Sequence, residues 1–138
     1  SVEKKLFVET NNGTNRQIRP VTPEQPLRIG DKVIVRLTIR TDREMNYVFL
    51  KDLRAGCFEP ADQLSGPESR DGIWYYRSPK DVSENFFINR LPEGTFVLEY
   101  PVYVSRSGEY AGGISTIQCM YAPEFVSHTA GESLRIMP

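Results

Sequence analysis

The chain has few side chains that could carry out chemistry. Its single histidine, His128, lies in the polar run Ser127-His128-Thr129. General acid–base catalysis and the activation of nucleophiles depend most often on histidine. No GxSxG, HExxH, phosphate-loop or dinucleotide motif accompanies it. We therefore interpret His128 as a solvated loop residue, and we predict that this chain is not an enzyme.

One segment comes close to a reactive motif. Cys57-Phe58-Glu59-Pro60 has the outline of C-x-E-Q, in which the cysteine sulfur is acylated by the glutamine side chain. Proline in the fourth position has no carboxamide to join to the sulfur. The thioester therefore cannot form in this chain.

Cys57 and Cys119 lie far apart, without the CxxC spacing of a zinc site. Two buried free thiols that act as small apolar residues are the favoured interpretation. A disulfide between them is the alternative in an oxidising compartment. No metal or other cofactor is expected.

Three further groups each have a functional and a structural interpretation. Glu59 and Asp62 could form an acid–base or calcium pair, but spacing alone is weak evidence for a site, and we favour a solvated loop. Asn12-Gly13-Thr14 matches a glycosylation acceptor, yet Asn-Gly between strand-like runs first indicates a turn. Trp74-Tyr75-Tyr76 could stack on sugars; in a β-sheet, alternate members would face the core, and we favour core packing.

The bulk composition restricts the class of partner. A formal net charge of −1 argues against nucleic acid and anionic membranes, which both normally require a basic excess. No run approaches the roughly 18–20 apolar residues that cross a bilayer, so no direct membrane insertion is expected. Residues 1–138 fit one domain. Because both ends read as strands, we expect a piece of a much longer chain.

The elements that must position these residues are strands. Val33–Arg40 alternates strictly, with Val33, Val35, Leu37 and Ile39 on one face. Further strands are expected at Tyr47–Leu53, Ile73–Arg77, Asn85–Asn89 and Phe96–Val104, with Pro101 at an edge or bulge. The span from Glu59 to Gly72 is expected to be irregular. Seven to eight strands with regular turn signals predict an all-β protein, a two-sheet antiparallel β-sandwich of immunoglobulin-like or fibronectin-like topology.

The run Gln118–Phe125 carries the clearest local signal. It begins like a buried strand, and Pro123 should stop or bend the strand near Ala122 because proline lacks an amide hydrogen. Tyr121 and Phe125 then flank the bend, with Glu124 beside them. We expect Tyr121 to point inward and Phe125 outward.

Six segments, in order, resemble the C-terminal (tenth) macroglobulin domain of bacterial α2-macroglobulins over most of residues 25–136. They are Gly30–Ile39, Asp42–Val48, Ala55-Gly56 with Glu59-Pro60, Trp74–Arg77, Phe86-Phe87 with Leu91–Thr95, and Met120–Phe125. The resemblance implies a macroglobulin-type β-sandwich from the C-terminal end of a large, secreted or lipid-anchored protein of the periplasm or cell envelope that traps proteases. The bait region and any thioester would lie in other domains.

The resemblance implies a non-catalytic structural and interaction domain. Its partners would be neighbouring domains of the parent chain, including a thioester domain where one exists, and proteases only through the parent. Tyr121, Glu124 and Phe125 are the candidate domain-interface residues, with the Glu59–Gly72 loop as a second surface. The rival hypothesis is a free-standing adhesive or carbohydrate-binding sandwich that uses Trp74, Tyr75 and Tyr76.

Overall fold

The structure is a computed structural model of the chain. It describes residues 1–12, 15–22, 24–61, 66–70, 73–80, 82–129, 131 and 133–138. At residues 11, 12, 15, 16, 66–70 and 122–125 it describes the backbone alone.

Every regular element of the described residues is a β-strand, which confirms the predicted fold class. In chain order the strands are β1 Val2–Asn12, β2 Asn15–Pro20, β3 Leu27–Arg28, β4 Lys32–Thr41, β5 Met45–Leu53, β6 Phe58–Pro60, β7 Gly66–Arg70, β8 Ile73–Pro79, β9 Ser83–Leu91, β10 Gly94–Val104, β11 Gly108–Ala111, β12 Ser115–Cys119, β13 Ala122–His128 and β14 Ser133–Met137.

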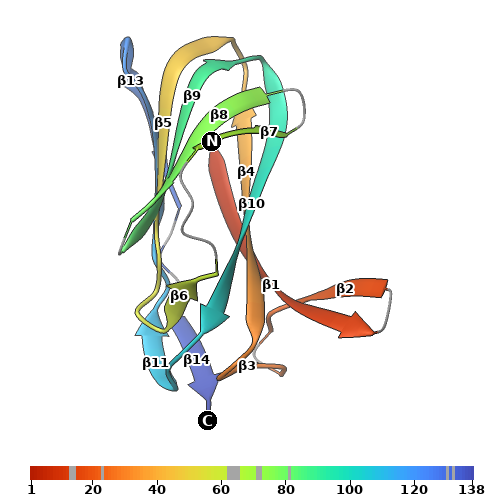
Figure 1. Cartoon of the computed structure of the whole chain (residues 1–138). Coiled ribbons are helices and arrows are strands. Elements are labelled where there is room, and N and C mark those ends of the chain that lie inside the picture. Colours follow the sequence, from red (N-terminus) through yellow and green to blue (C-terminus); the bar gives the residue numbers. More distant parts are fainter. Residues whose placement is uncertain are drawn as a thin grey trace.

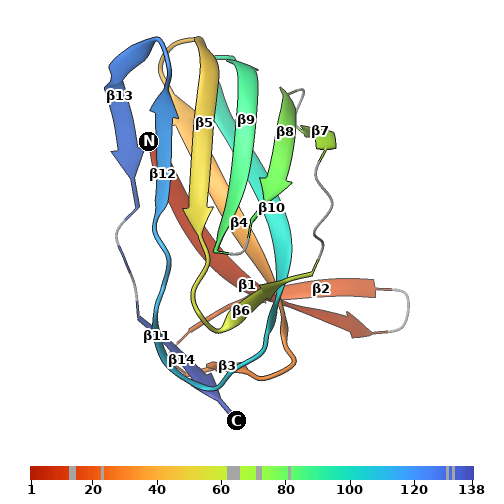
Figure 2. The same cartoon turned by 60° about the vertical axis from the view of Figure 1, so that its left-hand side comes forward.

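Two larger sheets face each other across the core (Figures 1 and 2). One has the order β2-β1-β4-β10-β6 and the other the order β13-β12-β5-β9-β8-β7. A small sheet, β11-β14-β3, lies at the end of the sandwich that holds the C-terminus, and the β1–β2 hairpin projects from the side (Figure 1). The predicted two-sheet sandwich is therefore confirmed.

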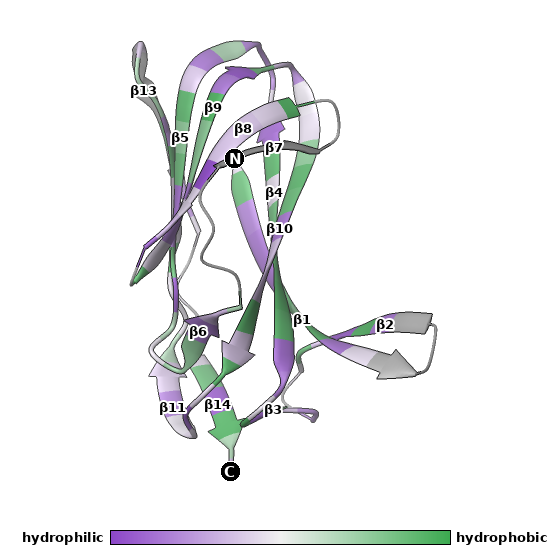
Figure 3. Cartoon of the chain, in the orientation of Figure 1, coloured by the Kyte–Doolittle hydropathy of each residue, from purple (hydrophilic) through white to green (hydrophobic). Residues whose placement is uncertain are grey.

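The core forms because alternate side chains of facing strands point between the sheets. Val33, Val35, Leu37 and Ile39 of β4 are all buried, as their alternation predicted. Hydrophobic and hydrophilic bands alternate along β5 and β9 in Figure 3. On β10 the same parity buries Leu98, Tyr100, Val102 and Val104, which confirms the face predicted for Phe96–Val104.

Pro101 lies where an amide hydrogen is not needed. β10 pairs with β4 along one side, while its other side meets only the short β6. The Pro101 carbonyl accepts a bond from the Ala61 amide at 3.4 Å, so the backbone polar groups of Pro101 face the β6 side. In an antiparallel strand both groups of one residue point the same way. The missing N–H therefore faces the sheet edge, as predicted.

The span from Glu59 to Gly72 is more ordered than predicted. Backbone pairing continues through β6, and β7 pairs antiparallel with β8. Residues 62–65, 71 and 72 lie outside the described residues, and so does Asp62 of the predicted acidic pair. Short pairings such as β3, β6, β7 and β11 also raise the strand number above the seven or eight expected, because segments of two to five residues leave little period in a sequence.

The outer faces of the two large sheets differ in chemistry. On the five-stranded sheet, ion pairs connect neighbouring strands: Lys32–Glu9, Arg36–Glu99 and Arg40–Glu3. The outer face of the six-stranded sheet carries aromatic side chains on three neighbouring strands, β5, β9 and β8. The two outer faces therefore differ, with ion pairs between strands on one and aligned aromatic side chains on the other.

Candidate functional site

The candidate site is the turn that joins β12 to β13. β12 ends at Cys119 and β13 begins at Ala122, with Cys119 opposite Ala122, so Met120 and Tyr121 form the turn. Their side chains are 72% and 75% exposed. Both side chains therefore lie at the tip of an edge hairpin, away from the core.

Tyr47 of β5 holds this turn in place. Its carbonyl accepts a hydrogen bond from the Met120 amide at 3.1 Å. Its ring meets the Tyr121 ring edge-on, with ring centres 5.3 Å apart. Tyr47 also has a φ of 56°, in the left-handed region that a bulky residue rarely adopts. Such strain persists only where surrounding contacts impose it, and it concentrates at functional sites.

The strand ends close to Ala122, as predicted, because β12 stops at Cys119 and the chain turns at Met120-Tyr121. Two parts of the expectation were wrong. Pro123 is not the cause of this end, since it lies after the turn and within β13. β13 is an edge strand, where a missing amide hydrogen is tolerated. Tyr121 points outward rather than inward, since it lies in the turn at the tip of the hairpin and is largely exposed.

The other two candidate interface residues, Glu124 and Phe125, belong to β13. Their side chains are outside the described residues, so the expected outward direction of Phe125 stays a prediction.

The outer face of the six-stranded sheet carries four aromatic residues, which we call the aromatic face: Phe49, Trp74, Tyr76 and Phe87. Phe87 lies directly opposite Phe49 on one side and Tyr76 on the other. The rings of Phe49 and Phe87 stack at 4.9 Å. Aligned cross-strand aromatic pairs stabilise a sheet and also form a flat apolar surface.

Trp74-Tyr75-Tyr76 divides between the two sides of the sheet. Tyr75 is 6% exposed and packs against Phe86 in the core, whereas Trp74 is 71% exposed. The predicted alternation is correct. A sugar platform of all three side chains is impossible because the Tyr75 ring is inside, and only Trp74 and Tyr76 face outward.

A polar cluster crosses the sandwich interior. The Asp52 carboxylate of β5 accepts hydrogen bonds from Lys4 Nζ at 2.7 Å, from Ser115 Oγ at 2.6 Å and from the Tyr100 hydroxyl. Burial of the Tyr100 ring, and then the nearby Asp52 charge, raise the pKa of Tyr100 well above its usual range. Ser115 is fully buried and its hydroxyl donates to a carboxylate, so this serine–aspartate pair supports the fold and is closed to substrates.

A second buried carboxylate lies beside this cluster. Glu84 of β9 stands opposite Asp52 and accepts hydrogen bonds from Arg77 Nε and, at 3.0 Å, from Arg54 Nη1. Burial raises the pKa of Glu84, while the two guanidinium groups oppose that rise. Buried charges need such partners, since removing one partner of a buried ion pair lowers the free energy of unfolding by about 3–5 kcal/mol.

Both cysteines are buried free thiols. The Cys119 thiol donates to the Asn46 carbonyl, with Sγ 3.1 Å from the oxygen. Among the described residues no three His, Cys, Asp or Glu side chains gather into a metal site. His128 is exposed, with Nδ1 3.3 Å from the Thr129 carbonyl.

Sequence reasoning missed Tyr47 as the support of the candidate turn, and Phe49 and Phe87 as part of the aromatic face. A signal for Phe87 was present, because adjacent residues of a strand face opposite sides, and Phe86-Phe87 must therefore place one ring outside. For Tyr47 no signal existed, since a positive φ at tyrosine cannot be read from its residue type.

Within the part of the chain that the structure covers, no helix has the length and apolar character needed to span a membrane.

Residues 1–124 match the family model described as the bacterial alpha-2-macroglobulin MG10 domain. The chain therefore belongs to this family, as the sequence resemblance predicted.

Solved structures show the same fold. A mutant of Salmonella alpha-2-macroglobulin is 21% identical with a TM-score of 0.75, and 99% of this chain covers 9% of that one. Trypsin-activated alpha-2-macroglobulin from Escherichia coli is 16% identical with a TM-score of 0.74, and 99% of this chain covers 10% of it.

A curated relative, Circularly permutated Ras protein 2 of Dictyostelium discoideum, is 28% identical over 109 residues. That match includes 79% of this chain and spans 3% of the relative's length. The chain is thus a small fraction of the length of each of these proteins. Alpha-2-macroglobulins are protease-trapping proteins rather than enzymes, and this chain is a macroglobulin domain of that family.

Proposed function

We propose that the chain is a non-catalytic packing domain of a bacterial alpha-2-macroglobulin-like protease trap, and that the Met120-Tyr121 turn contacts a neighbouring domain of the parent chain. The observation that carries this proposal is the combination of high exposure and fixed position at Tyr121. Its side chain is 75% exposed, yet the Tyr47 ring and a backbone bond to Tyr47 hold the turn.

Glu124 and Phe125 follow the turn on the same edge strand and extend the proposed contact along β13. The neighbour would be the thioester domain where the parent has one. Proteases would meet this domain only through the parent, which we place in the periplasm or cell envelope. The described residues provide no catalytic arrangement, since the interior Ser115–Asp52 pair is buried and His128 lies outside it.

Hydroxyl-radical footprinting tests the contact. Met120 and Tyr121 should be oxidised readily in the isolated chain and protected in the native parent polypeptide. Tyr103, which is exposed on the five-stranded sheet, is the matched control and should be labelled equally in both. Equal labelling of Tyr121 in the two forms would remove the proposal.

The alternative, a carbohydrate-binding sandwich, keeps one supporting observation: Trp74 and Tyr76 are exposed side chains of one flat face. Trp74 is the only tryptophan of the chain, so fluorescence reports on this face directly. Titration with oligosaccharides should change Trp74 emission if sugars stack there, and Trp74→Phe should remove the signal. A flat titration would leave the packing domain as the sole proposal.

A further inference from the structure

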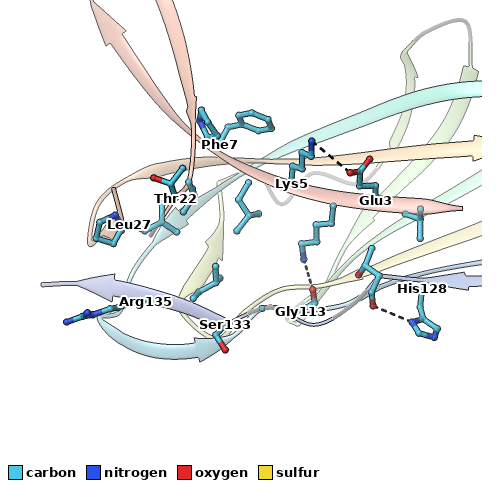
Figure 4. A pocket seen from close by; sticks show the side chains of 18 residues that line it. Glu3, Lys5, Phe7, Thr22, Leu27, Gly113, His128, Ser133 and Arg135 are labelled. Atoms are coloured by element: carbon cyan, nitrogen blue, oxygen red, sulfur yellow. Dashed lines mark hydrogen bonds and ion pairs between the residues drawn. The ribbon is translucent and has the colours of Figure 1, made fainter. Parts of the chain in front are cut away.

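A groove runs along the N-terminal half of β1, on the side away from β4. It is a cavity of about 870 Å³. One wall consists of residues Val2 to Phe7, and the opposite wall of His128, Thr129 and residues Ser133 to Arg135 (Figure 4). Neither Met120, Tyr121 nor any residue of the aromatic face lines it.

The backbone of β1 turns unpaired polar groups toward this groove. The Arg40 amide donates to the Ser1 carbonyl at 2.8 Å, so Ser1 and every second residue after it bond to β4. The intervening residues face the other way, as the bond from the Val21 amide to the Leu6 carbonyl confirms. In an antiparallel strand, the amide and carbonyl of one residue share a direction. Val2 and Lys4 therefore direct both groups away from β4.

No strand of the described residues pairs with this part of β1. β2 covers only its far end, beginning opposite Phe7, and no described backbone group bonds to Val2 or Lys4 on the open side. A row of unpaired N–H and C=O groups at a sheet edge is a template for an added strand.

The inner part of the groove lining is apolar. Val2 and Leu27 are buried, and Leu6, Val21 and Leu134 are partly buried against the core. These side chains can receive the inward side chains of an added strand, because residues opposite Val2 and Lys4 would point the same way as those two. At Leu6 the open side is already closed by the bond from the Val21 amide.

Lys4 would not repel such a strand. An inward-pointing charge can protect a sheet edge from pairing. The Lys4 ammonium, however, is already bonded to Asp52 at 2.7 Å, to the Leu53 carbonyl at 3.2 Å and to the Gly113 carbonyl at 3.0 Å. Its charge is therefore neutralised inside the sandwich.

Lys5 favours a negatively charged residue on a strand that pairs with this edge. Its side chain is 64% exposed, and its ammonium lies 3.9 Å from Glu3, a distance at the limit of an ion pair. Glu3 is also bonded to Arg40 at 3.2 Å. Lys5 thus remains able to pair with a carboxylate on an incoming strand, directly across from it.

We propose that the open edge of β1 binds an extended peptide segment by strand addition. The segment has apolar side chains at alternate positions, which enter the groove, and a carboxylate opposite Lys5. This second contact surface is independent of the Met120-Tyr121 contact, and it would hold even if that contact failed.

The test uses synthetic eight-residue peptides that alternate valine with threonine, with a glutamate placed in turn at each threonine position. Hydrogen exchange of the 138-residue chain, resolved by NMR, is the readout. The free chain should exchange the Val2 and Lys4 amides quickly. Bound peptide should slow the hydrogen exchange of these two amides. The effect should be strongest for the peptide whose glutamate lies opposite Lys5. A peptide with proline at a central valine position should not bind.

Two variants identify the interactions. Val2→Pro removes the amide hydrogen that faces the groove and leaves the bonds to β4 intact. It should weaken peptide binding about tenfold, since one hydrogen bond to the peptide is lost. Val2→Ala keeps the amide and is the matched control, with a smaller loss. Lys5→Glu should reverse the preference, so that lysine peptides replace glutamate peptides. Slow exchange of the β4 amides shows that each variant is folded.

Two results would overturn the proposal. One is fast exchange at Val2 and Lys4 in a folded chain at millimolar peptide. The other is protection of these amides without peptide that rises with protein concentration together with dimer mass in sedimentation. In that case the edge belongs to a second copy of the chain.

Discussion

The Tyr100 hydroxyl of β10 donates a hydrogen bond to the Asp52 carboxylate of β5, so this bond crosses the interior from one sheet to the other. Tyr100→Phe should lower the free energy of unfolding by about 1–3 kcal/mol, because one buried Asp52 oxygen loses its donor. Urea unfolding monitored by circular dichroism measures the change. Tyr103→Phe removes an exposed hydroxyl and should stay within ~0.5 kcal/mol of the parent chain. Equal effects would mean that the interior bond contributes nothing.

Lys4 and Lys5 form a natural pair for comparison, since they are adjacent but face opposite sides of β1. Lys4 is 12% exposed and neutralises Asp52, which is fully buried. Lys4→Met should destabilise the chain by about 3–5 kcal/mol, because it leaves the Asp52 charge without its cation. Lys5→Met should change stability by less than ~0.5 kcal/mol. Thermal unfolding of both variants checks the difference, and a stable Lys4→Met variant would contradict the assignment.

Tyr121 and Tyr75 allow a comparison of one exposed and one buried tyrosine. Tyr121→Ala should cost less than ~1 kcal/mol, since the side chain is largely exposed and its ring contact with Tyr47 is at an edge. Tyr75→Ala should cost about 3–5 kcal/mol because it leaves a cavity against Phe86. Chemical denaturation ranks the two. A large loss at Tyr121 would make it a core residue and would end its role as a contact.

Gly113 cannot accept a side chain. A Cβ built there would lie 1.7 Å from the Leu53 carbonyl oxygen, so Gly113→Ala must displace the backbone that also receives the Lys4 ammonium. We expect a loss of at least ~1–3 kcal/mol, as for other overpacked sites. A Cβ built at Gly131 would lie 3.7 Å from the Ile114 side chain and 3.9 Å from the Gly112 carbonyl oxygen, both ordinary van der Waals distances. Gly131→Ala should unfold at nearly the parent midpoint.

Burial raises the pKa of the Cys57 thiol. The native chain should therefore react slowly with a thiol reagent at Cys57, and unfolding in urea should restore full reactivity. The raised value also has a stability consequence. Above about pH 8.5 the unfolded thiol ionises while the native one stays protonated, so stability should fall as the pH rises.

Cys57→Ala removes this titration and should flatten the fall in stability between about pH 8.5 and 9.5. Tyr100, whose pKa is also raised, would add a further decline above about pH 10. An unchanged slope in Cys57→Ala would show that the thiol is not responsible.

The strands of the core were predictable because their period is strict. Val33 to Ile39 and Leu98 to Val104 alternate, and alternation determines which side faces the core. The hairpin at Met120-Tyr121 was not predictable in detail. Pro123 predicts the end of a strand, but at a sheet edge its missing amide hydrogen is tolerated. Edge position depends on strand order, which residue types alone do not reveal.

The polar interior also escaped prediction. Asp52 and Glu84 stand opposite each other on β5 and β9, and charged residues are normally placed on the surface. Their burial depends on Lys4, Arg54 and Arg77, which come from three separate segments. Only the tertiary fold brings these groups together.

Pro101 and the open edge of β1 lie on opposite sides of the five-stranded sheet. Growth of a fibre by repeated strand pairing needs two complementary free edges, one to give and one to receive. On the β10 side, the absent amide and the short β6 interrupt such pairing. If β1 binds a strand as proposed, the interrupted β10 side keeps that pairing from continuing from one copy of the five-stranded sheet to the next.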